Sequence, residues 1–324
     1  MGFIERSKSI RMAAALVAAG SLGLATVASA DELAPEAVIV GEEIAVVEAA
    51  ACPDCPAGNT GMISLAVGID FYDKYFFRGY TQQADGLQTQ PWAEVAIQLV
   101  DNGDKPFGDV SLFIGTWNSL NSRHHGFGDD PATTGPRNWY ESDFYAGVGT
   151  SLGWGVSASV SYIAYMYPNN EGRAGEGDTI GEIDLAFEYD DSEYLGDFAL
   201  SPYALFAFEI HNGTGTDSAG NSSEAGYFEF GVEPGYTVLG DTDYPISLSV
   251  PMSLGVSMYD MYYGDNDLGW AQLGGVVSVP LSFIPSSYGS WSVAAGVYGI
   301  WQSAAIRTGT AWQPNFGAGL SFDY

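Results

Sequence analysis

Residues 154–167 read WGVSASVSYIAYMY, an alternation of apolar residues with small or polar ones. Side chains of a β-strand point to opposite faces in turn, so this stretch predicts one strand with an apolar face and a mostly small, polar face. Residues 246–258, ISLSVPMSLGVSM, repeat the pattern. Strands of soluble proteins are typically about 5–6 residues long, whereas a tilted strand that crosses a bilayer needs about 9–11. Both stretches therefore predict membrane-spanning strands.

The same alternation continues through the rest of the chain and predicts twelve strands. Their expected ranges are 62–80, 87–100, 108–118, 139–151, 154–167, 179–190, 198–210, 224–238, 244–258, 268–281, 290–302 and 314–324. The number is even, as bacterial membrane barrels require. We expect an all-β fold, a transmembrane antiparallel up-and-down β-barrel of twelve strands.

The lengths of the predicted connections support this fold. If the amino terminus is periplasmic, every odd-numbered connection lies outside the cell. The long polar connections fall at those positions: 119–138, 168–178, 211–223, 259–267 and 303–313. Long outer loops and short inner turns are the usual asymmetry of such barrels.

Composition excludes several other classes of protein. The chain has 324 residues, of which 15% are charged, against about 25% in an average soluble domain. Its formal net charge is −30, which argues against a nucleic-acid partner because phosphate binding requires a basic surface. Past the amino terminus, no apolar run approaches the ~18 residues of a transmembrane helix.

The amino terminus has the order of an export signal. A basic segment, residues 6–11, precedes an apolar stretch, residues 12–27, and Ala28-Ser29-Ala30 then matches an A-x-A cleavage site. We expect residues 1–30 to be a cleaved signal peptide, and the barrel, residues 62–324, to lie in the outer membrane of a Gram-negative-type bacterium.

Residues 31–61 are expected to form a flexible, acidic periplasmic leader. They contain the only two cysteines of the chain, Cys52 and Cys55, in the sequence CPDCP. A zinc site needs more soft ligands than this pair, and a thioredoxin-like motif needs a strand–helix context that is absent here. A local disulfide between Cys52 and Cys55, formed in an oxidising compartment, is the simplest interpretation.

The last predicted strand suits the closure of a barrel. Residues 314–324 read PNFGAGLSFDY, with Phe322 and Tyr324 on the apolar face, and a terminal aromatic is a suitable interfacial anchor. The ending also resembles the carboxyl-terminal assembly signal of bacterial outer-membrane proteins. Phe322 and Tyr324 are therefore candidate signal residues, and the assembly machinery, outer-membrane lipids and lipopolysaccharide are expected partners. Further strand-end aromatics suggest two interfacial belts: Trp154, Tyr236 and Trp291 on one side, Tyr140 and Trp301 on the other.

The strand faces opposite to the apolar ones carry most of the charge. They hold twelve acids: Asp70, Glu94, Asp109, Glu141, Asp143, Glu182, Asp184, Glu188, Glu209, Glu229, Glu233 and Asp323. They hold two bases, Lys74 and Arg78. Acids that line a water-filled lumen attract cations and repel anions. The alternative interpretation is that these acids merely keep the interior wet.

Some inward side chains fill space and others leave it. The first four predicted strands direct large aromatics inward: Tyr72, Phe76, Trp92, Phe113, Trp117 and Tyr145. Serine and glycine prevail on the inward faces of the strands at 154–167, 246–258 and 314–324. We expect a narrow or partly occluded pore.

The two inward bases lead to a specific expectation. If the first two strands meet near residue 84, Lys74 lies opposite Glu94 and Arg78 lies opposite Gln90. Opposed side chains on one face are about 4.5–5.5 Å apart at Cβ, so we expect both bases to contact lumen acids, chiefly Glu94. The alternative is that both extend to the outer rim.

Residues 75–82, YFFRGYTQ, give the chain a family resemblance. They are similar to an aromatic-Arg-Gly-x-Ser/Thr-Gln element of the TorF family of outer-membrane porins, a family also described as a conserved domain of unknown function. Shorter stretches at 86–88, 115–119 and 165–168 resemble later parts of that family, and Phe77 and Tyr80 are bulkier than its pattern. The resemblance implies an outer-membrane barrel with pore activity and does not specify a solute.

An enzyme is the remaining class to weigh. His124, His125 and His211 all lie in predicted external loops. With Asp129 and Asp130 they could form a metal or hydrolytic site on the outer rim, but the same residues are common in ordinary loops. No serine lies in a nucleophile-elbow context. We therefore expect no catalysis, no metal and no cofactor.

The sequence favours an outer-membrane pore for the passive diffusion of small hydrophilic solutes, with a preference for cations. The alternative is a closed structural or adhesive barrel whose external loops bind a partner.

Overall fold

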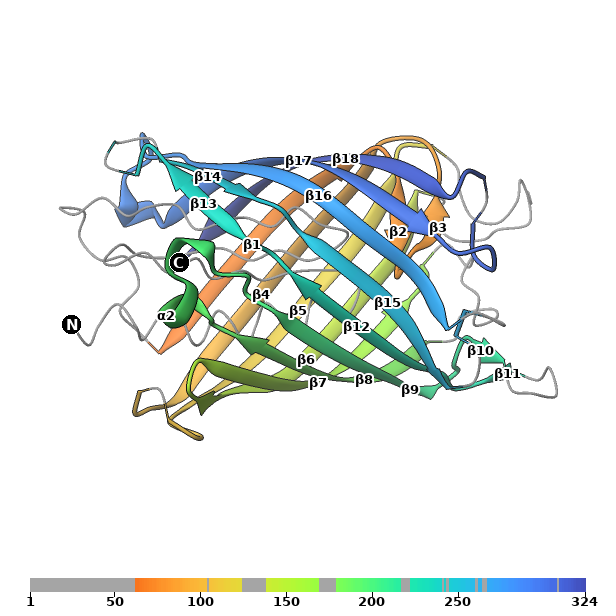
Figure 1. Ribbon diagram of the computed structural model, residues 1–324, viewed down its shortest axis with the longest axis horizontal. Coiled ribbons are helices and arrows are strands. Elements are labelled where there is room, and N and C mark those ends of the chain that lie inside the picture. Colours follow the sequence, from red (N-terminus) through yellow and green to blue (C-terminus); the bar gives the residue numbers. More distant parts are fainter. Residues whose placement is uncertain are drawn as a thin grey trace.

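The computed structural model of the protein is a closed antiparallel β-barrel (Figure 1). Fourteen strand segments share one sheet, and two pairs of them continue one another, so the wall has twelve strands, as predicted. The structure describes residues 62–103, 105–123, 138–168, 179–216, 222–240, 242, 245–259, 262–263, 267–307 and 309–324. The expected signal peptide, the leader with Cys52 and Cys55, and the loop residues His124, His125, Asp129 and Asp130 lie outside this part of the chain.

The wall is a simple meander in which each strand pairs with its neighbours in the sequence. Its strands are β1 (Ile63–Tyr72), β4 (Gln88–Asp101), β5 (Asp109–Asn121), β6 (Trp139–Gly153), β7 (Val156–Met166), β8 (Ile180–Tyr189), β9 (Tyr203–His211), β12 with β13 (Gly226–Val232, Gly235–Val238), β14 with β15 (Ile246–Ser249, Met252–Tyr259), β16 (Leu268–Pro280), β17 (Ser290–Gln302) and β18 (Trp312–Asp323).

Prolines account for the two interrupted wall strands. Pro234 separates β12 from β13, and Pro251 separates β14 from β15. Proline has no N–H to donate to the ladder, so a continuous strand is interrupted there. The neighbouring strands stay joined, because the N–H of Val250 donates to the carbonyl oxygen of Pro234 at 3.0 Å.

Pairing of the first strand with the last closes the barrel. In the register of β1 with β18, Ala66 lies opposite Asp323 and Tyr72 lies opposite Gly317. One step further, Leu65 and Tyr324 exchange both backbone hydrogen bonds at 2.8 Å each. The last residue of the chain is therefore part of the seam, and closure leaves no strand edge unpaired at this point.

The two surfaces of the wall differ in the way that the alternation predicts. Apolar side chains such as Ile114, Leu273, Val297 and Phe316 are exposed on the outside. Carboxylates, hydroxyls and amides are buried on the inside, together with the predicted inward aromatics Tyr72, Phe76, Trp92, Phe113, Trp117 and Tyr145. An apolar exterior around a wall with no open edge is how a β-barrel spans a bilayer.

The first predicted strand, 62–80, is too long. β1 ends at Tyr72, and the chain then forms a separate hairpin, β2 (Tyr75–Phe77) with β3 (Tyr80–Gln83), outside the ladder of the wall. The Asp73 carboxylate accepts the N–H of Phe316 at 2.8 Å, and the Lys74 ammonium donates to the carbonyl oxygen of Pro314 at 2.6 Å. These contacts hold the chain at the rim, from which the hairpin leaves the wall.

The prediction that Tyr140 belongs to an outer aromatic belt is wrong. The pairing of β5 with β6 shifts between Ser119 and Leu120, so that Ser119 lies opposite Glu141 and Leu120 lies opposite Trp139. This bulge leaves Tyr140 as the extra residue, and Tyr140 is buried. A bulge changes the face to which the following side chain points, which strict alternation does not anticipate.

The remaining elements are short and lie at the two ends of the barrel. Figure 1 shows α2 (Ser192–Leu195) and the carboxyl terminus at one end, with β10 (Gly215–Thr216) and β11 (Ser222–Ser223) at the other. Two single turns of 3-10 helix, η2 (Gly196–Phe198) and η3 (Ser286–Tyr288), complete the set. Among the described residues, no helix is long and apolar enough to cross a bilayer.

Removal of Tyr324 is expected to impair formation of the barrel. Its loss takes away both seam hydrogen bonds to Leu65 and an outward aromatic side chain at the end of β18. We expect the heat-modifiable, folded form in cell envelopes to fall several-fold, with unfolded protein accumulating or being degraded. Tyr236→Ala is the control, since it removes an exposed tyrosine away from the seam. Undiminished folded barrel after the deletion would contradict a role for Tyr324 in assembly.

Candidate functional site: an acidic lumen holding a hairpin

All twelve acids predicted for the lumen face are buried inside the barrel. None of their side chains is more than 8% exposed, and they come from the part of the wall that runs from β18 through β1 to β12, while β7, β14 with β15, β16 and β17 carry none of them. The structure thus brings together Asp70, Glu94, Asp109, Glu141, Asp143, Glu182, Asp184, Glu188, Glu209, Glu229, Glu233 and Asp323. Their role as pore-lining residues remains a prediction.

The two predicted inward bases have different positions. Lys74 is at the rim, where its ammonium contacts the Asp73 carboxylate at 3.1 Å and is partly exposed. Arg78 is deep in the interior and 1% exposed. Within the described part of the chain, it is the one buried Lys or Arg.

The expected register of the first two strands is wrong. Glu94 lies opposite Ala66, and Gln90 lies opposite Asp70, so neither faces Lys74 or Arg78 across the ladder. The reason is the hairpin, because strand pairing ends at Tyr72 and Gln88 and the residues between them leave the wall. Arg78 does contact a strand-borne lumen acid, but the acid is Glu182 on β8 and not Glu94.

The β2–β3 hairpin lies inside the barrel, near the end opposite to α2 (Figure 1). Its turn is the pair Arg78 and Gly79, with φ of 48° and 79°, the geometry of a type I′ hairpin turn. A β-carbon on Gly79 would lie 2.4 Å from Cβ of Trp270. Glycine at this position therefore permits both the backbone conformation and the close approach of the turn to the wall.

Side chains from the wall and from a neighbouring loop hold this hairpin on several sides. Gln302 of β17 donates to the carbonyl oxygen of Gly79 at 2.6 Å and to the Thr81 hydroxyl at 2.9 Å. The Tyr263 hydroxyl donates to the carbonyl oxygen of Arg78 at 2.8 Å. Further anchors come from Tyr80 to the carbonyl oxygen of Tyr262 (2.6 Å), Tyr140 to Gln82 (2.8 Å) and Asn121 to Gln83 (2.7 Å).

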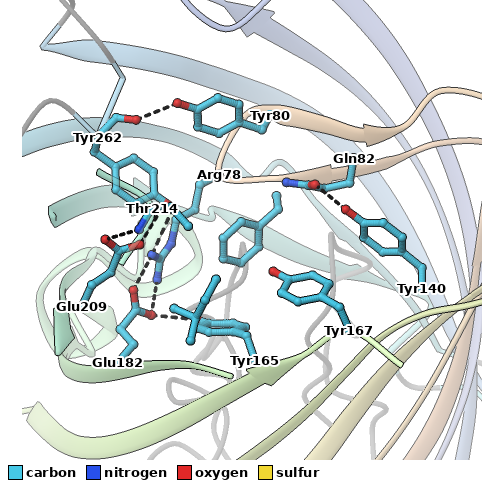
Figure 2. A pocket seen from close by; sticks show the side chains of 12 residues that line it. Arg78, Tyr80, Gln82, Tyr140, Tyr165, Tyr167, Glu182, Glu209, Thr214 and Tyr262 are labelled. Carbon is cyan, nitrogen blue, oxygen red and sulfur yellow. Dashed lines mark hydrogen bonds and ion pairs between the residues drawn. The ribbon is translucent and has the colours of Figure 1, made fainter. Parts of the chain in front are cut away.

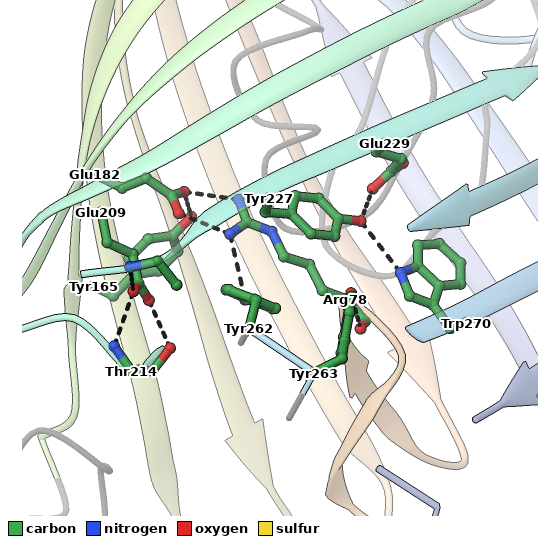
Figure 3. Close-up of polar contacts among 11 residues, drawn as sticks. Arg78, Tyr165, Glu182, Glu209, Thr214, Tyr227, Glu229, Tyr262, Tyr263 and Trp270 are labelled. Atoms are coloured by element: carbon green, nitrogen blue, oxygen red, sulfur yellow. Dashed lines mark hydrogen bonds and ion pairs between the residues drawn. The ribbon is translucent and has the colours of Figure 1, made fainter. Parts of the chain in front are cut away.

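Arg78 makes the central contact of the interior (Figure 3). Its Nη1 and Nη2 lie 2.7 Å from Oε2 and Oε1 of Glu182, a bidentate ion pair. The Tyr165 hydroxyl donates to Oε1 of Glu182 at 2.7 Å. The guanidinium also lies 4.3 Å from the ring centroid of Tyr227 and 5.0 Å from that of Phe77. The negative charge of Glu182, its two parallel hydrogen bonds and the surrounding aromatic rings all suit the planar, positively charged guanidinium group.

Tyr262, just beyond the end of β15, completes the surroundings of Arg78. Its hydroxyl lies 3.4 Å from Nη1 of Arg78. Burial raises the pKa of Tyr262 well above that of an ordinary tyrosine, although the nearby Arg78 charge acts in the other direction. The hydroxyl therefore stays neutral, and the ion pair of Arg78 is with Glu182.

A second group of contacts fixes the wall behind the ion pair. Tyr203 and Tyr227 both donate to the carboxylate of Glu229, one to each oxygen. Trp270 donates from Nε1 to the Tyr227 hydroxyl at 3.2 Å. The ring of Tyr227 is thus held in place by Glu229 and Trp270, independently of the guanidinium that it contacts.

A small pocket adjoins the ion pair (Figure 2). Five tyrosines, two carboxylates and the hairpin turn line it: Tyr80, Tyr140, Tyr165, Tyr167, Tyr262, Glu182, Glu209, Phe77, Arg78 and Gln82, with Ile180 and Thr214. The volume of this cavity is about 30 Å³. It has room for two or three water molecules at about 10–15 Å³ each. The hairpin thus leaves space for a few waters beside the ion pair.

Toward the α2 end, the interior has small polar side chains and no hairpin. Ser159 and Ser161 of β7 and Ser278 of β16 are buried, and within the described residues their hydroxyls have no protein partner. Buried polar groups are satisfied by protein or by water. This half of the lumen therefore has the chemistry of a water-filled space.

No group of three or more His, Cys, Asp or Glu side chains is placed to hold a metal ion among the described residues. His211 is described, and it lies exposed at the end of β9.

The fold and its interior define a transmembrane β-barrel with an acidic lumen. No family model matches the chain, and no curated protein matches it. An outer membrane channel from Pseudomonas putida F1 is similar at 13% identity, over 85% of this chain and 99% of that chain, with a TM-score of 0.43. The NanC porin (10% identity, 80% and 98% covered, TM-score 0.39) and LpxR from Salmonella typhimurium (7%, 80% and 99%, 0.43) are also similar. Likeness at this level extends to the barrel architecture alone.

Proposed function

We propose that the protein is an outer-membrane pore through which small hydrophilic solutes diffuse passively, with cations preferred. The observation that supports this proposal is the charge of the interior. Twelve buried acids line the wall, and Arg78, the one buried base among the described residues, is already paired with Glu182. The surplus of carboxylates attracts cations into the lumen and repels anions. No reaction and no cofactor enter this proposal.

The hairpin gives the proposed pore a narrow section. It projects into one end of the lumen, whereas buried serines such as Ser159 and Ser278 lie toward the other end. Solutes would pass through the tyrosine-lined pocket beside the hairpin, where Glu182 and Glu209 lie. In this proposal, the barrel is in contact with outer-membrane lipid and lipopolysaccharide, follows a signal peptide to its location, and is inserted by the assembly machinery.

The reversal potential across a planar bilayer under a KCl gradient tests the cation preference. We expect the sign that corresponds to cation permeation, and a smaller potential when Asp184, Glu188 and Glu233 are all replaced by their amides. These three are interior acids outside the Arg78 ion pair. The preference should weaken at high salt, since the Debye length falls to about 3 Å at 1 M.

A matched control separates lumen charge from total charge. Replacing the exposed Glu193 and Glu224 with glutamine also removes negative charge, but it should leave the reversal potential unchanged. An anion-selective potential in the unaltered protein would overturn the proposed preference.

A closed barrel that binds a partner through its loops is the second candidate. The observation in its favour is the hairpin itself, whose Tyr75, Phe76 and Arg78 are fully buried in the interior. The two candidates differ in one measurement, since a closed barrel inserted in a bilayer shows no current steps.

A further inference from the structure

The guanidinium group of Arg78 lies in a binding site whose other residues belong to the rest of the barrel. Glu182 and Tyr165 come from the wall strands β8 and β7, Tyr227 comes from β12, and Tyr262 follows β15 (Figure 3). Both carboxylate oxygens of Glu182 are 2.7 Å from the guanidinium nitrogens. These contacts all engage the guanidinium group, which is the part of the side chain that a free molecule could also present.

The wall side of this site is fixed by its own hydrogen bonds. Tyr165 donates to Glu182 at 2.7 Å, and Trp270 donates to the hydroxyl of Tyr227 at 3.2 Å. The hairpin that carries Arg78 forms a two-stranded sheet of its own and takes no part in the ladder of the wall. Receptor and occupant are therefore separable, because removal of the Arg78 side chain breaks no hydrogen bond between wall strands.

The chemistry of the site selects a narrow class of cation. A planar guanidinium matches two carboxylate oxygens with two parallel N–H groups, which an ammonium ion cannot do. Aromatic faces at 4.3 Å (Tyr227) and 5.7 Å (Tyr262) from the guanidinium carbon add attraction for a delocalised cation.

We propose that the site formed by Glu182, Tyr165, Tyr227 and Tyr262 is a receptor for free guanidinium and alkylguanidinium cations, which Arg78 occupies from the hairpin side. The inference rests on the proposed cation-preferring pore and deepens it by naming a class of cation. A tethered group competes at an effective concentration of the order of millimolar or above. Free cations therefore displace Arg78 from the intact protein only at comparable or higher concentrations.

Arg78→Ala opens the receptor to a free ligand. Alanine keeps Cβ, so the atoms removed correspond to ethylguanidinium, which is the probe. We expect about 20 mM ethylguanidinium chloride to raise the thermal unfolding temperature of this variant in detergent by ~4 °C relative to KCl of equal ionic strength, if the dissociation constant is about 1 mM. The same salt should shift the unfolding temperature of the unaltered protein much less, because the tethered Arg78 competes for the site.

Two controls identify the receptor. The double variant Arg78→Ala with Glu182→Gln has the same space but lacks the carboxylate, and ethylguanidinium should not stabilise it. Ethylammonium cannot donate two parallel N–H groups to the carboxylate. It should therefore raise the unfolding temperature of Arg78→Ala much less. An equal shift for both cations, or for both variants, would overturn the proposal.

The outcome remains decisive if Arg78→Ala folds poorly. The measurement is then the yield of heat-modifiable barrel on refolding with and without ethylguanidinium. Recovery by this cation, but not by ethylammonium, supports the receptor, and no recovery overturns it. Neither readout needs current through the barrel. A barrel that binds ethylguanidinium without conducting would therefore refute the pore alone, and one that conducts without binding would refute the receptor alone.

Discussion

Glu182→Ala is expected to destabilise the barrel by about 3–5 kcal/mol, the usual cost of removing one partner from a buried ion pair. Arg78 and Glu182 are each only 1% exposed, so bulk water solvates the remaining guanidinium poorly. Three of the nearest side chains, Tyr227, Phe77 and Tyr262, offer ring faces and a hydroxyl but no negative charge. The variant therefore leaves a buried cation without a directly paired carboxylate.

Equilibrium unfolding by urea in detergent or lipid vesicles measures this loss, with heat modifiability as a second readout. Glu188→Gln is the matched control, because it alters a buried acid on the same face of β8 that is not paired with Arg78. Replacing both members, Arg78→Met with Glu182→Leu, should cost less than Glu182→Ala alone, since neither charge of the pair is then left buried without its partner. Equal losses for Glu182→Ala and Glu188→Gln would show that the ion pair contributes little.

The part of this architecture that depends on alternation could be read from the sequence. Period-two patterning gives the strands, their number and which side chains face inward, so the lumen acids and the inward aromatics Trp92 and Trp117 were accessible without a structure. The alternation has a local cause, since successive side chains of a strand point to opposite faces. It does not fail until a bulge or a break intervenes, as at Tyr140 and after Tyr72.

The hairpin could not be read in the same way. Alternating aromatics continue through Tyr75 and Phe77, as if the first strand went on. The strand ends because Asp73 and Lys74 bond to residues of β18 that are far away in sequence. A local signal was present in Arg78-Gly79, a two-residue turn ending in glycine. The partner of Arg78 had no local signal, since Glu182 lies 104 residues further along the chain.

Excision of residues 75–85 is expected to raise single-channel conductance several-fold. Tyr72 lies directly opposite Gln88 in the ladder, so the deletion leaves residues 73, 74, 86 and 87 as a four-residue connection, a common length for a β-hairpin. The wall keeps all its strands. The lumen loses the fully buried side chains of Tyr75, Phe76 and Arg78, and water takes their place. Glu182 loses its ion-pair partner but is then solvated by this water.

Current steps in planar bilayers at fixed KCl concentration measure the effect. Tyr80→Phe is the control. It removes one anchor of the hairpin, the hydrogen bond to the carbonyl oxygen of Tyr262, but the hairpin stays in the chain. The conductance of this variant should therefore match that of the unaltered protein. The excised barrel should also keep its cation preference, since the acids of the wall remain. Steps of unaltered size after excision would place the narrowest point elsewhere in the lumen. Steps that occur only after excision would mean that the intact barrel is closed by its hairpin, because the deletion changes no other part of the wall.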